Sequence, residues 1–195
     1  MMFNKFFAIV LLILLSPVFI LVALLILFED GFPIFFMQKR VGVHYTFFNI
    51  YKFRSMKKNT PNVATHLLEN PKQYVLKMGR VLRKLSFDEL PNLINIIKGE
   101  MVFVGPRPAL FNQEDLMNLR IKAGVDQLKP GITGWAQING RDEISLEEKV
   151  NFEKEYAQRS DPFIRKSRAI CIENRKDIAQ IKFGRTSQFN QYYQR

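Results

Sequence analysis

The chain of 195 residues is long enough for a membrane segment and one globular domain with its own core. Its formal net charge of +11, from 29 Lys and Arg against 18 Asp and Glu, favours an anionic partner such as a lipid surface or a nucleotide diphosphate, and no nucleic-acid motif supports nucleic acid. One cysteine excludes an internal disulfide, and two histidines far apart in sequence exclude a histidine-based zinc site.

The first element is an apolar run over residues 6–28, in which only Ser16 is polar. About 20 helical residues cross a hydrocarbon core about 30 Å thick, so the run is long enough to enter a bilayer. Pro17 lacks a backbone donor and leaves a carbonyl that lipid cannot satisfy. The sequence therefore predicts a membrane element with a sharp bend at Ser16 and Pro17.

Three interpretations of this run compete. A cleaved signal peptide is rejected, because the apolar run is too long and no small-residue cleavage site ends it. A straight span and a helix that enters and leaves by the same face both stay open. Basic residues mark the cytoplasmic side, and they stand on both sides of the run, at Lys5, Lys39, Arg40, Lys52 and Arg54.

The next segments predict a β-hairpin, a loop and a helix. Residues 33–37 and 45–53 are the expected strands, joined by a turn over residues 39–44. Residues 57–71 are polar, contain two prolines and predict a surface loop. Residues 73–84 predict a short basic helix.

A stronger helix signal follows, with apolar residues spaced i, i+3, i+4, i+7 at Leu90, Leu93, Ile94 and Ile97, and Gly99 in the stop position. Beyond it the sequence predicts an extended segment over residues 101–104 and turns at 129–131 and 139–140. Two polar helices are expected over residues 147–160 and 165–181, and a loosely ordered tail after residue 183.

Asp88 and Glu89 stand at the start of the stronger helix. Ser86 and Glu89 form a capping-box pattern, which would make the acidic pair a plain helix start. Pro91 instead favours a start near Leu90, which leaves both carboxylates just outside the helix, at its positive end. An ionised carboxylate there can attack an electrophile or hold Mg²⁺, so capping and catalysis both stay open.

Three other places are candidates for phosphate or ligand binding. Arg107 lies between two prolines on a stiff backbone suited to phosphate recognition. Lys52 and Arg54 share one face of a predicted strand and are candidates for lipid phosphate. The glycine-rich segment 130–141 lets its backbone approach a ligand. For the charged residues the competing interpretation is ordinary solvated charge, and for segment 130–141 it is a packed loop.

Four sequence strings resemble the bacterial sugar transferases, the monotopic polyprenyl-phosphate phosphoglycosyl transferases. The strings are YKFRSM at 51–56, SFDELP at 86–91, KGEMVFVGPRP at 98–108 and PGITGWAQINGR at 130–141. The resemblance covers about residues 9–156 and implies the short form of the family. The implied α+β architecture is a re-entrant helix-break-helix over residues 1–30, then a small, mainly helical catalytic domain with a short β-hairpin over residues 31–183, and a tail over 184–195.

The resemblance also implies an activity. The family transfers a sugar 1-phosphate from a UDP-sugar to undecaprenyl phosphate with Mg²⁺, releasing UMP at the cytoplasmic face of the bacterial membrane. This step begins a glycoconjugate such as a capsule or exopolysaccharide. Membrane lipid is an expected partner, nucleic acid is not, and a homodimer stays open.

By motif, the resemblance makes Asp88 the nucleophile of a phosphosugar-aspartyl intermediate and Glu89 the Mg²⁺ ligand. The implied substrate-binding residues are Lys52 and Arg54 near the polyprenyl phosphate, Arg107, Pro108 and Arg141 near the nucleotide-sugar phosphates, and also Arg83 and Gln137. Ser16 and Pro17 match the family's helix break, which favours the re-entrant form.

The sequence departs from the family at Phe87, where leucine is usual, and after Asp161, where a charged segment replaces a largely aliphatic one. Two other functions therefore stay in view. One, suggested by the positive charge, is a membrane-tethered protein whose basic surface binds nucleic acid or an acidic polymer. The other is an inactive scaffold of the same fold.

Overall fold

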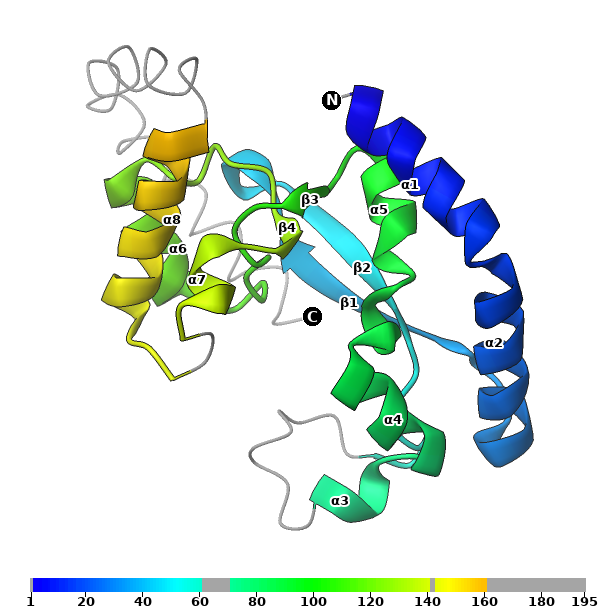
Figure 1. Cartoon of the computed structure of the whole chain (residues 1–195). Helices are drawn as coiled ribbons and strands as arrows, with labels where there is room; N and C mark the ends of the chain where they lie inside the picture. Colours follow the sequence, from blue (N-terminus) through cyan, green and yellow to red (C-terminus); the bar gives the residue numbers. More distant parts are fainter. Residues whose placement is uncertain (1, 61–70, 141–142, 161–195) are drawn as a thin grey trace, which may run out of the picture.

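A computed structural model describes residues 2–60, 71–140 and 143–160, and in it a bent N-terminal helix pair flanks a mixed domain (Figure 1). Helices α1 (Met2–Leu14) and α2 (Ser16–Asp30) meet at an angle of 61°. Because Pro17 has no N–H, the carbonyl of Ile13 loses its helical partner, and the Ser16 hydroxyl donates to that carbonyl at 2.7 Å. The predicted bend at Ser16 and Pro17 is confirmed.

The helix pair has one face built into the domain and one apolar face turned outward. Ala8 and Ile26 are fully buried against the domain, and Phe7 meets Phe103 edge to face at 5.4 Å. The exposed large apolar side chains include Phe3, Phe6, Ile13, Leu14, Ile20, Leu21 and Phe28. Among the described residues no single helix has the length and apolarity for a membrane crossing, and only this bent pair meets both together.

The predicted hairpin is confirmed as β1 (Phe35–Val41) paired antiparallel with β2 (Phe47–Phe53). The predicted turn over residues 39–44 is wrong, because β1 continues to Val41, whose N–H donates to the carbonyl of Ala109 at 3.0 Å. The chain reverses later, through the 3₁₀ turn η1 (Val43–Tyr45). Arg40 therefore lies in a strand, on the same face of the hairpin as Lys52.

The predicted helix over residues 73–84 is two helices, α3 (Pro71–Tyr74) and α4 (Lys77–Leu85). The chain between them pairs with the segment after β2, where the N–H of Leu76 donates to the carbonyl of Ser55 at 3.1 Å. Gly79 permits this approach, because a Cβ there would lie 2.2 Å from the same carbonyl oxygen.

The acidic pair lies in a 3₁₀ turn, η3 (Phe87–Glu89), ahead of α5 (Asn92–Lys98). The expected capping box does not form, because Ser86 is left-handed with φ 57° and its side chain makes no cap hydrogen bond. Pro91 takes the N-cap position of α5, so the interpretation that left both carboxylates outside the helix is confirmed. Gly99 ends the helix at φ 84°, as predicted.

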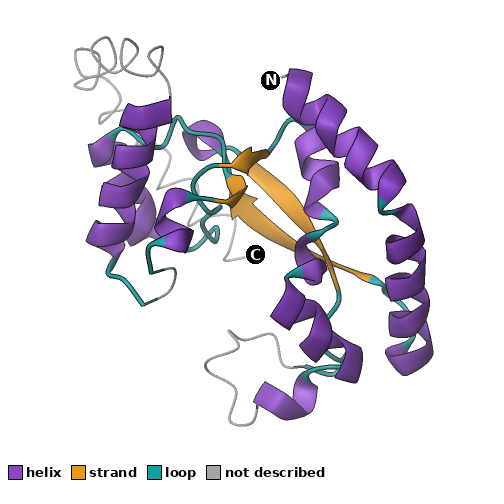
Figure 2. Cartoon of the chain, in the orientation of Figure 1, coloured by secondary structure: helices purple, strands orange, loops and turns teal. Residues whose placement is uncertain are grey.

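A second, parallel sheet pairs β3 (Val102–Val104) with β4 (Gly131–Thr133) (Figure 2). The sequence predicts β3 as an extended segment but misses β4, which follows the turn expected at 129–131. The remaining helices are α6 (Glu114–Ala123), α7 (Trp135–Ile138) and α8 (Leu146–Ser160), and only α8 was predicted. The predicted helix 165–181 and the tail 184–195 lie outside the described residues.

The hairpin contributes to each of the three hydrophobic clusters formed by the described residues. Val41 joins the cluster of α6 and α8, Ile50 joins α1 and α5, and Phe53 joins α2 and α4. The two strands therefore connect the N-terminal helix pair to the rest of the domain.

A buried asparagine ties α5 to the hairpin. Asn95 is fully buried, its Oδ1 accepts the N–H of Tyr51 at 3.2 Å, and its Nδ2 donates to the carbonyl of Asn49 at 2.7 Å. We expect Asn95→Ala to lower the free energy of unfolding by about 1–3 kcal/mol, because both backbone groups lose their partner. Chemical denaturation in detergent measures this. Asn118→Ala, on the exposed face of α6, should change it by less than about 0.5 kcal/mol. Equal losses in the two variants would contradict this role.

Candidate active site

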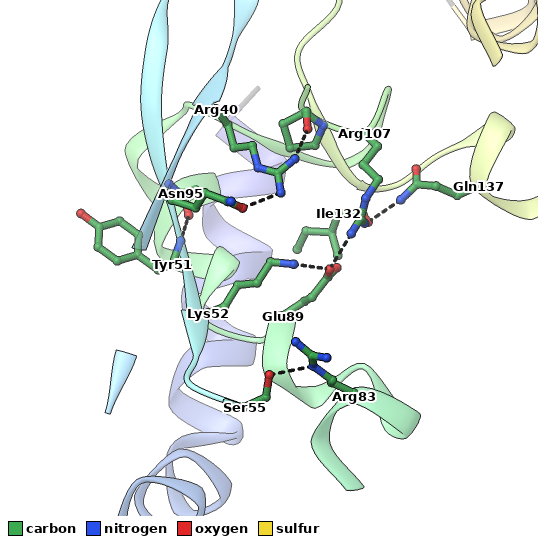
Figure 3. A network of polar contacts seen from close by, with 12 residues as sticks. Arg40, Tyr51, Lys52, Ser55, Arg83, Glu89, Asn95, Arg107, Ile132 and Gln137 are labelled. Carbon is green, nitrogen blue, oxygen red and sulfur yellow. Dashed lines mark hydrogen bonds and ion pairs between the residues drawn. The ribbon is translucent and has the colours of Figure 1, made fainter. Parts of the chain in front are cut away.

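Glu89 lies between cations from two distant segments (Figure 3). Its Oε1 accepts a hydrogen bond from Lys52 Nζ at 2.7 Å and one from Arg107 Nη2 at 3.2 Å. Burial acts to raise the pKa of Glu89, but Lys52 and Arg107 outweigh it and hold the pKa below its ordinary value. Glu89 is therefore ionised at neutral pH.

Asp88, the neighbouring carboxylate, is half-buried in a different electrostatic setting. Burial raises the pKa of Asp88 above its ordinary value, against the opposing charges of Lys52 and Arg83. Arg83 is oriented by its Nε, which donates to Ser55 Oγ at 2.9 Å. Two adjacent carboxylates whose pKa values move in opposite directions are typical of a functional site.

The predicted site residues divide into two groups. Lys52, Arg83, Asp88, Glu89 and Arg107 come together, although they come from β2, α4, η3 and the segment after β3.

Arg54 lies apart from that group. Its buried guanidinium donates to the Asp30 carboxylate and to the carbonyl of Gly31, and so ties the end of α2 to the strand. Contact of Arg54 with lipid phosphate stays a prediction. Arg141 lies outside the described residues.

A cavity of about 440 Å³ opens beside Glu89 and reaches the N-terminal helix pair. Its polar side includes Glu89, Arg107 and Gln137, and its apolar lining is Leu11, Leu15, Leu90, Leu93, Phe103, Ile132 and Ile138. Gln137 Nε2 donates to the carbonyl of Ile132 at 3.0 Å, while its Oε1 is buried and has no partner among the described residues. The cavity therefore suits a ligand with a charged head and an apolar chain.

Arg40 belongs to the site, although the sequence analysis missed it. It lines a small cavity with Lys52, Glu89 and Arg107, and its Nη1 donates to the carbonyl of Pro108 at 3.0 Å. Burial, helped by the charge of Arg107, lowers the pKa of Arg40 to about 10. The sequence predicts a turn at residue 40. A strand predicted to continue through residue 40 would have identified Arg40 by the alternation of its side chains.

The carboxylate pair offers oxygen donors of the kind that Mg²⁺ prefers, but it is not a closed metal cage. No group of three or more His, Cys, Asp or Glu within the described ranges is placed to hold a metal ion. In proteins Mg²⁺ is held by one or two carboxylates together with substrate phosphates. Lys52 and Arg107 both bond Oε1 of Glu89, and Oε2 has no hydrogen bond from the described residues, so it is available to a cation. The residues therefore fit Mg²⁺ bound jointly with a phosphate ligand.

These features together suit phosphoryl transfer. A carboxylate oxygen of Asp88 can act as a nucleophile, and cations fixed before the ligand arrives can stabilise charge that develops on phosphate oxygens.

Comparison with known proteins points in the same direction. A family model described as bacterial sugar transferase matches residues 1–170. The chain is 38% identical over 186 residues to the uncharacterized sugar transferase EpsL of Bacillus subtilis, covering 95% of this chain and 90% of that protein. It is 41% identical over 173 residues to the exopolysaccharide production protein ExoY of Sinorhizobium fredii, covering 80% and 75%. Identity to the UDP-glucose:undecaprenyl-phosphate glucose-1-phosphate transferase of Escherichia coli is 39% over 157 residues, or 76% of this chain and 34% of that protein.

Proposed function

Because the chain belongs to the bacterial sugar transferase family, we propose that it transfers a sugar 1-phosphate from a UDP-sugar to undecaprenyl phosphate and releases UMP. Relatives named as undecaprenyl-phosphate glucose and galactose phosphotransferases support this proposal. The observation that carries it is the carboxylate pair Asp88 and Glu89 among the cations Lys52, Arg83 and Arg107, with Glu89 and Arg107 lining a cavity that reaches α1.

The proposed reaction has two displacements at one phosphorus. In the first, a carboxylate oxygen of Asp88 attacks the sugar-bearing phosphorus of the UDP-sugar, the bond to the bridging oxygen breaks, and UMP leaves. In the second, an oxygen of undecaprenyl phosphate attacks the same phosphorus, and the bond to Asp88 breaks. The product is undecaprenyl-diphospho-sugar, and the carboxylate is restored.

The surrounding side chains bind and orient the phosphates. Lys52 and Arg107 both bond Oε1 of Glu89, so phosphate oxygens placed beside Glu89 would meet both cations. Glu89 and the substrate phosphates would hold Mg²⁺, which supplies positive charge at the phosphate oxygens when bound. Burial raises the pKa of Asp88, and the charges of Lys52 and Arg83 act in the opposite direction and favour the ionised carboxylate that attack requires.

The N-terminal helix pair supports the acceptor and the location that we propose. Leu11 of α1 and Leu15 at the break between α1 and α2 line the apolar side of the cavity, where the first units of a polyprenyl chain would be shielded from water. We place α1 and α2 in the cytoplasmic membrane as a re-entrant element, with the catalytic domain in the cytoplasm, where UDP-sugars are made. The reaction would then be the first membrane step of a bacterial glycoconjugate pathway.

The test is turnover by the purified full chain. Detergent-solubilised protein is incubated with Mg²⁺, undecaprenyl phosphate and each of a panel of UDP-sugars, and UMP release is measured. We expect UMP release with at least one UDP-sugar, and release beyond one equivalent per enzyme only when the lipid acceptor is present. Binding of UDP-sugars without UMP release from any of them would favour the inactive scaffold, and no binding would favour the membrane-tethered binding protein.

Glu89→Gln is expected to raise the Mg²⁺ concentration needed for half-maximal activity by about tenfold or more, because a neutral amide is a poorer ligand for a hard cation. A Mg²⁺ titration of UMP release measures this. Glu147→Gln, on the exposed start of α8, is the matched control and should leave the titration unchanged. An unaltered Mg²⁺ requirement in Glu89→Gln would remove Glu89 as the metal ligand.

A further inference from the structure

The segment that carries Arg107 is held by hydrogen bonds to its backbone. The N–H of Gly105 donates to the carbonyl of Thr133, and the N–H of Gly131 donates to the carbonyl of Pro106, both at 2.8 Å. A Cβ at Gly131 would lie 2.2 Å from the nitrogen of Gly105, so the two segments touch backbone to backbone. The carbonyls of Arg107 and Pro108 are left for other partners.

Two arginines from different elements bond these two consecutive carbonyls. Arg40 of β1 donates to the carbonyl of Pro108 at 3.0 Å, and Arg120 of α6 donates to the carbonyl of Arg107 at 2.9 Å. The Arg107 side chain keeps a third of its surface exposed, and Glu89 is its hydrogen-bond partner within the described ranges. The direction of the Arg107 side chain therefore depends on how firmly its backbone is held.

Arg120 is itself oriented by an acidic residue from α8. Its Nε donates to Glu153 Oε2 at 2.8 Å, and its Nη2 donates to Glu153 Oε1 in a two-pronged pair. Both side chains are almost wholly buried, with exposed fractions of 6% and 2%. The same Nη2 also bonds the Arg107 carbonyl, so Glu153 fixes the atom that holds the backbone.

We infer that Arg120 and Glu153 are positioning residues, which hold the backbone of Arg107 so that its guanidinium meets the phosphates bound beside Asp88 and Glu89. This inference rests on the proposed function for its catalytic meaning. It extends the active site through a chain of contacts that runs from Glu153 to Arg120, to the Arg107 carbonyl, and from the Arg107 guanidinium to Glu89.

A purely structural role for the pair is the competing explanation. Helices α6 and α8 already share an apolar cluster that includes Leu116, Met117, Val150 and Ala157, which joins the two helices without the ion pair. A buried ion pair is weak evidence for stability, because apolar residues of similar volume often replace one without loss. A purely structural role of the ion pair does not explain the third hydrogen bond, which Arg120 donates to the Arg107 carbonyl.

A double-mutant cycle separates the two roles. Arg120→Lys keeps the charge but loses the planar fork, and we expect kcat/KM to fall by about ten- to a hundredfold, since a displacement of about 1 Å can lower a rate by about a hundredfold. In an Arg107→Ala background the same substitution should lower kcat/KM by less than about twofold, because the residue that it positions is gone. Arg159→Lys, an exposed arginine of α8, is the matched control. Equal falls in both backgrounds, or no fall in either, would overturn the inference.

A variant with apolar residues in place of the ion pair is the control for loss of folding. The combined variant Arg120→Met with Glu153→Leu removes the ion pair without leaving a buried charge, so we expect the unfolding midpoint to stay or rise. Its kcat/KM should still fall by about tenfold or more. A variant that is both stable and fully active would show that the pair does not position Arg107.

Hydrogen–deuterium exchange tests the same contact without any turnover. In Arg120→Lys the peptides covering residues 102–109 and 129–135 should exchange faster than in the parent, while those of α5 stay unchanged. If no UDP-sugar is turned over, the proposed function fails and this measurement still decides the inference. Unchanged exchange in both peptides would overturn it.

Discussion

Replacing Asp88 by asparagine is expected to lower turnover by about 10⁴-fold or more, the scale seen when a covalent nucleophile is removed from other enzymes. The amide has the shape of the carboxyl group, but it cannot serve as the nucleophile in the first displacement or as the leaving carboxylate in the second. The fold should persist, because Asp88 lies in the 3₁₀ turn ahead of α5 and its carboxylate is half-buried rather than part of the core. UMP release measures the loss, and the unfolding midpoint checks the fold.

Two further variants make the Asp88 result specific. Asp88→Ala should be equally inactive, and it cannot revert to aspartate by deamidation as asparagine can. Asp115→Asn, on the exposed first turn of α6, changes the same chemical group away from the site and should keep full turnover. Substantial activity in Asp88→Ala would show that another group is the nucleophile.

Pro17→Ala is expected to shift the helix pair toward one continuous helix. Proline in a helix interior costs about 3 kcal/mol relative to alanine, and about 1.4 kcal/mol is a tenfold change in an equilibrium, so the ratio of continuous to bent forms should rise about a hundredfold. The new N–H at position 17 would bond the Ile13 carbonyl, which the Ser16 hydroxyl satisfies at present. A helix over residues 6–28 would then be long enough to cross the membrane.

Cysteine labelling in intact cells measures this change of topology. Asn4 is replaced by cysteine and Cys171 by serine, and a membrane-impermeant thiol reagent is applied from outside. Position 4 should be protected in the parent and labelled in Pro17→Ala. A second reporter, Lys154→Cys on the exposed face of α8, should stay protected in both until the cells are permeabilised. Equal external labelling of position 4 in both proteins would mean that the parent already spans the membrane.

The parts of the fold that could be predicted from the sequence depend on local physical chemistry. The bend at Ser16 and Pro17 follows from one missing N–H, and α5 follows from its apolar spacing, with Gly99 as its stop. The position of Asp88 and Glu89 outside α5 follows from the preference of proline for a helix start.

The parts that could not be predicted depend on partners far away in the chain. Strand β1 continues to Val41, where it pairs with Phe47 of β2 and also donates to the Ala109 carbonyl, and β4 is recognisable only beside β3. The missed turn position concealed Arg40, and nothing local distinguishes Arg120 or Glu153 from ordinary charges of an amphipathic helix. Burial gives these residues their importance, and burial is a property of the whole fold.

Trapping the phosphosugar-aspartyl intermediate tests the covalent route most directly. The full chain is mixed with Mg²⁺ and the UDP-sugar that supports turnover, without undecaprenyl phosphate, and is then quenched and digested for mass spectrometry. The proposed mechanism predicts a mass increase of one sugar phosphate on the peptide containing Asp88, absent from Asp88→Asn and lost when undecaprenyl phosphate is added. Turnover with no adduct on any peptide, or an adduct on a residue other than Asp88, would contradict it.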